Sequence, residues 1–178
     1  MSDSLIFFHY FKTPVGELIL GSFDGKLCLC DWRYRKMRDS VDSRIEKYLN
    51  ACLEPRTTPI IEETIRQLTE YFAGERTQFE IPLLLAGTHF QESVWNELQK
   101  IPFGKTISYQ ELSRNLGNEK AIRAVATANG ANAISILIPC HRIIGKDGSL
   151  VGYAGGLPAK KKLLEIEDAL TDNQMKLF

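Results

Sequence analysis

The fold of this chain is decided by residues 108–132, which read SYQELSRNLGNEKAIRAVATANGAN. Ser108 followed three residues later by Glu111 is the pattern of a capping box, so a helix is predicted to begin at Ser108. A glycine-asparagine pair at 117–118 ends that helix, and its asparagine can cap a second helix over about 119–129. Two short helices around a glycine-bearing turn are typical of a helix-turn-helix, although many helical hairpins with this pattern bind nothing.

The second of these helices is predicted to be thin, because alanine dominates its sequence. Ala121 and Ala124 are among its small residues, and Arg123 projects between them as a long basic side chain. A thin helix can approach another surface closely. That surface is either the neighbouring helix or the groove of a nucleic acid, and the pattern alone does not separate the two.

The chain has a formal net charge of +0, but its charges are unevenly distributed. Residues 1–85 contain 11 Lys/Arg and 13 Asp/Glu, whereas residues 100–162 contain ten basic and three acidic residues. The second segment therefore has a net charge of +7, which favours a polyanionic partner. On charge alone, a solvated charged face is an equally good interpretation.

The composition is that of a globular protein with 178 residues, 44% of them apolar and 25% charged, which allows one or two domains. The first ten residues, MSDSLIFFHY, lack the basic start of a signal peptide, and no apolar stretch approaches the length of a membrane span. The four cysteines are few and unevenly spaced, which favours reduced thiols over a disulfide framework. We therefore expect a cytoplasmic protein with no membrane partner.

The N-terminal part is predicted to be rich in strands. Residues 16–32, GELILGSFDGKLCLCDW, contain two alternating runs joined by an Asp-Gly pair, which is a hairpin signal. Cys28 and Cys30 lie two residues apart on the second run and are expected to face the same way. That spacing permits a metal site, but small buried residues of a strand are the better interpretation.

A helix over residues 59–73 is predicted to follow these strands. A proline and a glycine then break the pattern, so the chain is predicted to divide into residues 1–85 and residues 86–178. The second part opens with a helix over about 90–100, before the segment quoted first. Strands and a helix in the first part, with mainly helices in the second, predict a two-domain α/β protein.

Residues 136–145, ILIPCHRIIG, contain a nucleophile, a base and a cation side by side. A thiol attacks as its thiolate, and His141 and Arg142 offer a base and a positive charge that favour this form. On an extended chain neighbouring side chains point to opposite sides, so contact between Cys140 and His141 requires an irregular backbone or a bridging water. A Cys-His hydrolase and a buried structural cysteine are both compatible with these residues alone.

The sequence around this cysteine resembles that of a known family, the O6-alkylguanine-DNA alkyltransferases or methylated-DNA–protein-cysteine methyltransferases. The match to their active-site region lies in residues 128–167, which read ANGANAISILIPCHRIIGKDGSLVGYAGGLPAKKKLLEIE. GKTISYQEL at 104–112 and KAIRAV at 120–125 are similar as well, so that the resemblance covers residues 86–168. It implies a small, strand-rich, ribonuclease-H-like N-terminal domain and a mainly helical C-terminal domain with a helix-turn-helix.

The resemblance implies a role for each matched residue of the reaction centre. Cys140 corresponds to the alkyl acceptor, and His141 resembles the base that acts on it through a water. Glu167 matches the carboxylate that orients this histidine, and Asn132 resembles the asparagine that links the recognition helix to the active-site strand. A proline usually follows that asparagine in the family, but Ala133 stands here, which loosens the turn.

The resemblance also assigns residues to the DNA and to the substrate base. Tyr109 matches a tyrosine that helps to turn the target nucleotide out and contacts its base, and Arg123 matches the arginine that fills the vacated place. Ala121 and Ala124 lie on the same recognition helix and are expected to face the DNA. The residues that match the guanine pocket are Tyr153, Ala154, Gly155 and Ile143, the last through its carbonyl oxygen.

The implied activity is DNA repair by irreversible, single-turnover transfer of a methyl or other alkyl group from O6 of guanine to Cys140 after nucleotide flipping. Transfer from O4 of thymine is expected as well. The implied partner is double-stranded DNA containing O6-alkylguanine, bound by a monomer that needs no cofactor. No metal site is expected, since His9, Cys28, Cys30 and Cys52 do not assemble into a convincing one.

Three alternative functions from other classes are each compatible with part of the sequence. A non-enzymatic protein that recognises the lesion would lack the cysteine that is present at position 140. A transcriptional regulator could use the same helix-turn-helix, but relatives of that kind carry an additional domain. A cysteine-dependent hydrolase would turn over repeatedly, whereas an alkyl acceptor is consumed stoichiometrically.

Overall fold

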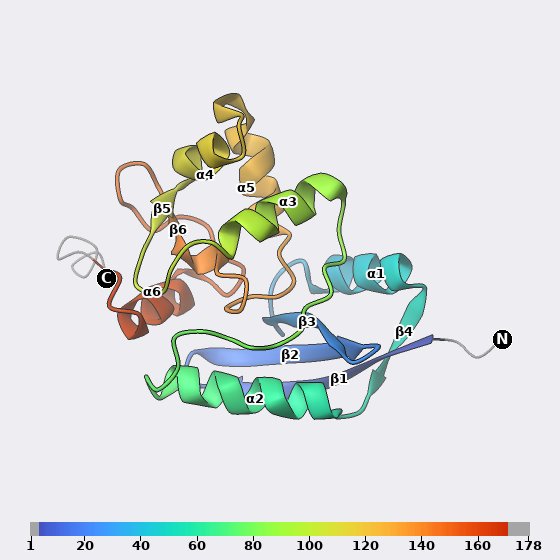
Figure 1. Cartoon of the computed structure of the whole chain (residues 1–178). Coiled ribbons are helices and arrows are strands. Elements are labelled where there is room, and N and C mark those ends of the chain that lie inside the picture. The colour runs from blue at the N-terminus through green and yellow to red at the C-terminus, as the bar shows by residue number, and fades with distance from the viewer. Residues whose placement is uncertain (1–3, 171–178) are drawn as a thin grey trace.

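The computed structural model describes residues 4–170, and their first part forms a four-stranded sheet (Figure 1). Its strands are β1 (Ser4–Thr13), β2 (Gly16–Phe23), β3 (Lys26–Trp32) and β4 (Ala51–Pro55), in the order β3-β2-β1-β4. β2 is antiparallel to β1 and to β3, whereas β4 runs parallel to β1. The predicted hairpin is confirmed, because Asp24 and Gly25 have positive φ angles in the turn between β2 and β3.

Two helices belong to this part of the chain. α1 (Arg38–Leu49) joins β3 to β4, and α2 (Pro59–Phe72) lies along the sheet. The Thr58 hydroxyl accepts a hydrogen bond from the first turn of α2, and Pro59 occupies that turn, so both start signals are used. The helix predicted over residues 59–73 is therefore confirmed to within one residue, whereas α1 was not predicted.

The two cysteines of β3 face different ways, so the prediction that they share a face is wrong. The pairing of β2 with β3 changes register between Gly21 and Ser22, and such an irregularity breaks the strict alternation of side chains. Cys28 packs in the apolar cluster that includes α1, whereas Cys30 packs in the cluster that includes α2. The pair therefore does not present two thiols to one ligand.

The second part contains the helices that the sequence predicted, with α4 and α5 at the end of the molecule opposite the sheet (Figure 1). Its elements are α3 (His89–Leu98), β5 (Ile107–Ser108), α4 (Tyr109–Asn115), η1 (Glu119–Ala121), α5 (Ile122–Gly130), η2 (Cys140–Arg142), β6 (Ile143–Ile144) and α6 (Leu157–Ile166). Within residues 4–170, none of the helices combines the length and the apolar character that a bilayer crossing requires.

The helix-turn-helix is confirmed, and its caps are those expected from the sequence. The Ser108 hydroxyl accepts a hydrogen bond from the Glu111 amide (3.1 Å), and the Glu111 carboxylate accepts one from the Ser108 amide (2.7 Å). The Asn118 side chain accepts a hydrogen bond from the Lys120 amide and caps η1, a 3₁₀ turn that leads into α5. The second helix therefore begins with a tighter turn than predicted.

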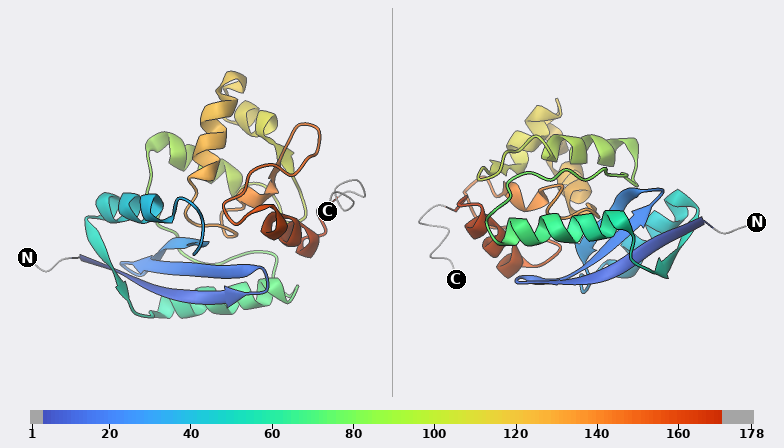
Figure 2. Two further views of the ribbon diagram at one scale, coloured as in Figure 1. Left: turned by 180° about the vertical axis from the view of Figure 1, so that it is seen from behind. Right: turned by 60° about the horizontal axis from the view of Figure 1, so that its bottom comes forward.

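One apolar core joins the two parts of the chain. It contains Leu18 and Leu20 of β2, Leu68 of α2, Val94 of α3, Leu112 of α4 and Leu163 of α6. Backbone hydrogen bonds also cross between the parts, from the Cys30 amide to the Ala133 carbonyl (2.8 Å) and from the Ser135 amide to the Cys30 carbonyl (2.6 Å). The segment between α5 and η2 thus runs beside β3, between the helices and the sheet (Figure 2).

Candidate active site

Cys140 lies in a short turn that an asparagine holds in place. Pro139 precedes this turn, η2, and the cysteine is only 4% exposed. The Asn132 amide nitrogen donates to Cys140 Sγ (3.2 Å) and to the Ile138 carbonyl (2.9 Å). The Asn132 oxygen accepts from the Ile134 amide (2.9 Å). Because Asn132 follows α5 closely in the chain, these bonds fix the thiol relative to that helix.

The neighbouring Glu167 is a buried carboxylate that accepts four hydrogen bonds. The donors are His141 Nε2 (2.7 Å), the Tyr71 hydroxyl (2.7 Å), and Nε (2.8 Å) and one terminal nitrogen (3.1 Å) of Arg142. Burial raises the pKa of Glu167, but the hydrogen bonds from His141 and Arg142 outweigh burial and bring this pKa to about 2. Glu167 is therefore ionised at neutral pH and can only accept hydrogen bonds.

His141 is a neutral base with one free ring nitrogen. An ionised Glu167 requires the proton of the neutral imidazole to sit on Nε2, which leaves the lone pair on Nδ1. Burial lowers the pKa of His141, although the hydrogen bond to Glu167 opposes this shift. Nδ1 is buried and has no protein partner among residues 4–170. The ring is thus prepared to accept a proton at Nδ1.

The Cys140 thiol is protonated in the resting protein. Burial raises the pKa of Cys140, and the hydrogen bond from Asn132 and the charge of Lys160 oppose this effect only in part. A protonated thiol is a poor nucleophile, so chemistry at Cys140 requires a base to remove its proton. The adjacent His141 is the neutral group that fits this requirement.

A cavity of about 380 Å³ opens onto Cys140. This volume falls within the range of about 300–1,000 Å³ that is usual for small-molecule sites. Its lining residues are Arg35, Tyr109, Ala126, Asn129, Gly130, Asn132, Cys140, Gly152, Tyr153 and Ala154. The structure thus brings Tyr109, Tyr153 and Ala154, which the family resemblance assigned to the substrate, to the same space as the thiol.

Two residues expected in the guanine pocket lie elsewhere. Ile143 does not line this cavity, and its carbonyl oxygen accepts a hydrogen bond from Lys160 Nζ. Gly155 packs against the Trp32 indole, where a Cβ atom would come within 2.4 Å of the ring. Gly155 therefore allows the loop to lie close to β3, since any larger residue would collide with this indole.

The expected positive surface is smaller than the sequence predicts. Lys160, which counted toward the charge of +7, is 0% exposed and also donates to the carbonyl oxygens of Val151 (2.9 Å) and Gly152 (3.3 Å). Burial lowers the pKa of Lys160 to about 8. Arg142 is likewise buried and paired with Glu167. These two cations hold the site together from within, so the prediction that they contribute to a polyanion-binding surface is wrong.

The helix-turn-helix turns its small residues and its arginine outward. Arg123 and Ala124 are exposed on α5, and Ala121 is half-buried at the end of η1. Tyr109, at the start of α4, is half-buried and lines the cavity at Cys140. α5 therefore carries exposed residues near its start, whereas residues nearer its end, Ala126, Asn129 and Gly130, line the cavity.

Two polar residues of this site come from the N-terminal part and were not predicted. Arg35 lines the cavity, pairs with Asp31 (2.9 Å), and donates to the carbonyl oxygens of Gly130 (2.7 Å) and Asn132 (3.3 Å). Tyr71 donates to Glu167. The sequence offers one signal for Tyr71, which is its place on the apolar side of the helix predicted over residues 59–73. A tyrosine that is buried there needs a hydrogen-bond partner for its hydroxyl.

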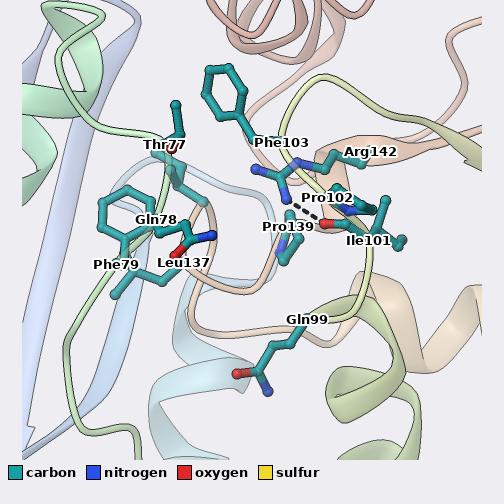
Figure 3. A pocket seen from close by; sticks show the side chains of 11 residues that line it. Thr77, Gln78, Phe79, Gln99, Ile101, Pro102, Phe103, Leu137, Pro139 and Arg142 are labelled. Carbon is teal, nitrogen blue, oxygen red and sulfur yellow. Dashed lines mark hydrogen bonds between the residues drawn. The ribbon is translucent and has the colours of Figure 1, made fainter.

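A larger cavity of about 590 Å³ lies behind η2 (Figure 3). It is lined by Phe79 of the N-terminal part, by Phe103, and by Pro139 and Arg142, whose guanidinium donates to the Ile101 carbonyl (2.6 Å). Cys140 does not line this cavity. Although it is the larger of the two, the smaller cavity is the candidate active site because it contains the thiol.

Comparisons with known proteins agree with this geometry. The family model "6-O-methylguanine DNA methyltransferase, ribonuclease-like domain" matches residues 6–85, and the model of the same family's "DNA binding domain" matches residues 89–169. These matches confirm the expected ribonuclease-like N-terminal and helical DNA-binding C-terminal parts.

Curated relatives match over nearly the whole chain. A methylated-DNA–protein-cysteine methyltransferase of Methanosarcina acetivorans is 40% identical over 163 residues, covering 91% of this chain and 98% of the relative. The constitutive enzyme of that name from Bacillus subtilis is 42% identical over 157 residues, with coverage of 88% and 92%. The crystal structure of Mycobacterium tuberculosis OGT in complex with DNA superposes with a TM-score of 0.78 at 37% identity, covering 92% and 93%. This chain therefore belongs to the 6-O-methylguanine DNA methyltransferase family.

Proposed function

We propose that this chain, like its curated relatives, is a methylated-DNA–protein-cysteine methyltransferase that repairs O6-methylguanine in DNA. The acceptor in this proposal is Sγ of Cys140. The observation that carries the assignment is a thiol at a substrate-sized cavity, next to a neutral histidine with a free ring nitrogen. The exposed face of a helix-turn-helix beside the same cavity supports DNA as the source of the substrate.

The proton of the thiol moves to His141 in this mechanism. A bridging water takes the Cys140 proton and passes one to Nδ1 of His141, and the ionised Glu167 stabilises the imidazolium that forms. The resulting thiolate attacks the alkyl carbon, a carbon–sulfur bond forms, and the bond between that carbon and O6 of guanine breaks. The electron pair of the broken bond stays on O6, the guanine anion takes up a proton from solvent water, and the repaired guanine remains in the DNA strand, which dissociates from the alkylated protein.

Developing charge on the leaving oxygen requires hydrogen-bond donors at the cavity. Tyr109, Tyr153 and Ala154 line it, and we assign this role to the Tyr109 hydroxyl and to the backbone amides around Ala154. The pKa of Tyr109 is raised by burial and by the nearby Cys140, so its hydroxyl keeps its proton for donation. The product is a thioether, from which water does not regenerate the thiol, so each molecule acts once.

The lesion has to leave the base stack before it can reach Cys140, because an alkyl group on O6 lies inside the duplex. We assign Arg123 to the space that the extruded nucleotide vacates and Tyr109 to the extrusion itself. Unstacking costs about a few kcal/mol, which phosphate contacts and the inserted arginine offset. The exposed Ala124 and the half-buried Ala121 have small side chains, which allows this end of α5 to approach the groove closely. The same cavity is proposed to accept O4-alkylthymine.

The proposal is tested by weighing the intact protein after incubation with duplex DNA containing O6-methylguanine. We expect the mass to rise by one methyl group, in proportion to the lesion supplied, with peptide mapping assigning the methyl group to Cys140. Unmethylated DNA of the same sequence is the control. The reaction is expected to proceed unchanged in a chelating buffer and with the protein eluting as a monomer. An unchanged mass, or repeated turnover without modification, would contradict the proposal.

A further inference from the structure

The catalytic carboxylate is contacted by a tyrosine from the other part of the chain. Tyr71 lies near the end of α2 and is 1% exposed. Its hydroxyl donates to Oε1 of Glu167 at 2.7 Å, the oxygen that also accepts from Nε2 of His141. Tyr71 and Glu167 are separated by 96 positions in the sequence. One oxygen is therefore shared between the N-terminal part and the proposed base.

The Tyr71 ring is fixed by aromatic neighbours from both parts of the chain. Its centroid lies 5.3 Å from that of Phe72, 5.5 Å from that of Phe79 and 6.3 Å from that of Phe103. Phe79 and Phe103 also line the cavity behind η2 (Figure 3). The contacts with Phe72 and Phe103 are edge-to-face and the contact with Phe79 is tilted. Close packing on three rings allows little movement, so the hydroxyl is held at a defined point.

The hydroxyl is also a permanent donor. Burial raises the pKa of Tyr71, and the adjacent Glu167 raises it further. The phenol therefore keeps its proton at neutral pH and donates it in a hydrogen bond to the ionised carboxylate. Arg142 donates to the same carboxylate, to Oε2 from Nε and to Oε1 from one terminal nitrogen. Together the two residues leave Glu167 no freedom to rotate away from His141.

We propose that Tyr71 is a positioning residue for alkyl transfer, through which the N-terminal domain holds Glu167, and hence His141, in the orientation that receives the proton of Cys140. This inference rests on the proposed function. It gives the ribonuclease-like domain a part in the reaction beyond its share of the core. Tyr71 itself touches neither the substrate nor the reacting sulfur.

Loss of the hydroxyl has two separable effects on the proposed base. The carboxylate loses one of the contacts that fix its direction, so the histidine is held less well. Oε1 also no longer accepts a hydrogen bond from the phenol. The hydrogen bond between Oε1 and His141 therefore strengthens, which favours the imidazolium form and raises the pKa of His141. The titratable and charged groups around this imidazole are Cys140, Arg142, Tyr153, Lys160 and Glu167, and none of them is altered by the substitution.

The test compares Tyr71→Phe with Thr64→Val. Thr64 lies on the same helix, is 0% exposed, and donates its hydroxyl to the Ile60 carbonyl (2.7 Å), far in the chain from the reaction centre. Each substitution deletes one buried hydroxyl of α2. Single-turnover methylation of Cys140 is followed by mass spectrometry across a pH series, with free O6-methylguanine and with methylated duplex. The amplitude of the methylation reaction gives the fraction of protein that can react. The rate constant does not depend on this fraction, so partial misfolding does not change it.

For Tyr71→Phe we expect the rate constant to fall about tenfold with both substrates, the size of effect usual when an outer hydrogen-bond partner is removed. Duplex binding is expected to stay unchanged, and the acid limb of the profile is expected to move to higher pH. Thr64→Val is expected to lower thermal stability without moving that limb. A parent protein that fails to form methylcysteine would instead refute the proposed function.

Three results would overturn the role of Tyr71 while leaving the proposed function intact. One is a Tyr71→Phe rate constant within the range of Thr64→Val. Another is a pH profile that superimposes on that of the parent. If Tyr71→Phe is poorly folded, all three proteins are measured in an osmolyte buffer that favours the folded state. The third result is a Tyr71→Phe protein that stays unfolded in this buffer, which would make the hydroxyl a requirement for folding and would contradict a positioning role.

Discussion

Cys30 and Cys140 are both buried cysteines of the same apolar cluster, yet only one has the surroundings of a nucleophile. Burial raises the pKa of both thiols, so each is protonated at neutral pH. Cys30 sits on β3 between packed neighbours. Cys140 has a hydrogen-bond donor in Asn132, a neutral histidine beside it, and a cavity in front of it. Burial alone therefore does not create reactivity; a proton acceptor and room for a substrate do.

The largest expected effect comes from replacing the two cysteines in turn. Cys140→Ala is expected to abolish methyl transfer while leaving duplex binding in place, because it removes only the sulfur that we propose as the acceptor. Cys30→Ala is expected to retain full transfer and to lose about 1–2 kcal/mol of stability, the cost of a small buried group. Both variants are assayed by intact mass and by DNA titration. Transfer by Cys140→Ala would mean that another thiol is the acceptor.

The helices and the hairpin could be predicted from the sequence because their signals are local. The capping box of α4 lies within four residues, and the proline and threonine at the start of α2 are adjacent to it. α1 escaped prediction because Val41 and Ile45 are its only buried side chains, too few to produce a clear apolar stripe. The register shift in β3, which turned Cys28 away from Cys30, has no local signal at all.

Only some residues of the candidate site could be predicted from the sequence. Cys140, His141 and Glu167 followed from the family resemblance, and their geometry is compatible with it. Arg35 and Tyr71 reach the same site from the N-terminal part, and no spacing in the sequence relates them to Cys140. The backbone that leads to the cysteine was equally unpredictable, since Ile136 adopts a φ of 73°, which a β-branched residue rarely does.

Methyl transfer to Cys140 is expected to weaken at acid pH, because it depends on His141, and Cys30 is expected to have no part in this dependence. Burial lowers the pKa of this histidine, so it stays neutral down to a pH below its ordinary value of 6.5. Below that lowered pKa the imidazole is protonated and cannot take the thiol proton, so the rate constant should fall on the order of tenfold per pH unit. Rapid-quench single-turnover measurements give the profile. The limb should be the same in Cys30→Ala, and a limb above 6.5 would contradict a buried neutral base.

The smallest effect is expected at Arg123, to which we assign a role in access to the lesion rather than in the chemical step. Arg123→Ala should slow repair of methylated duplex by about tenfold, because the extruded nucleotide is no longer replaced in the stack. Its reaction with the free methylated base should match that of the parent, since Cys140, His141 and the cavity are untouched. Lys120→Ala, a neighbouring exposed cation of η1, is the matched control for charge alone. Equal losses on both substrates would refute a role in extrusion.

The contact between Gly155 and Trp32 has a consequence for how this chain can vary. A Cβ at position 155 would lie 2.4 Å from the indole, and this indole belongs to the other half of the polypeptide. A larger residue at 155 therefore requires a smaller one at 32. Halves exchanged between relatives, whether by recombination or by deliberate chimera, have to bring a compatible pair of residues to these two positions.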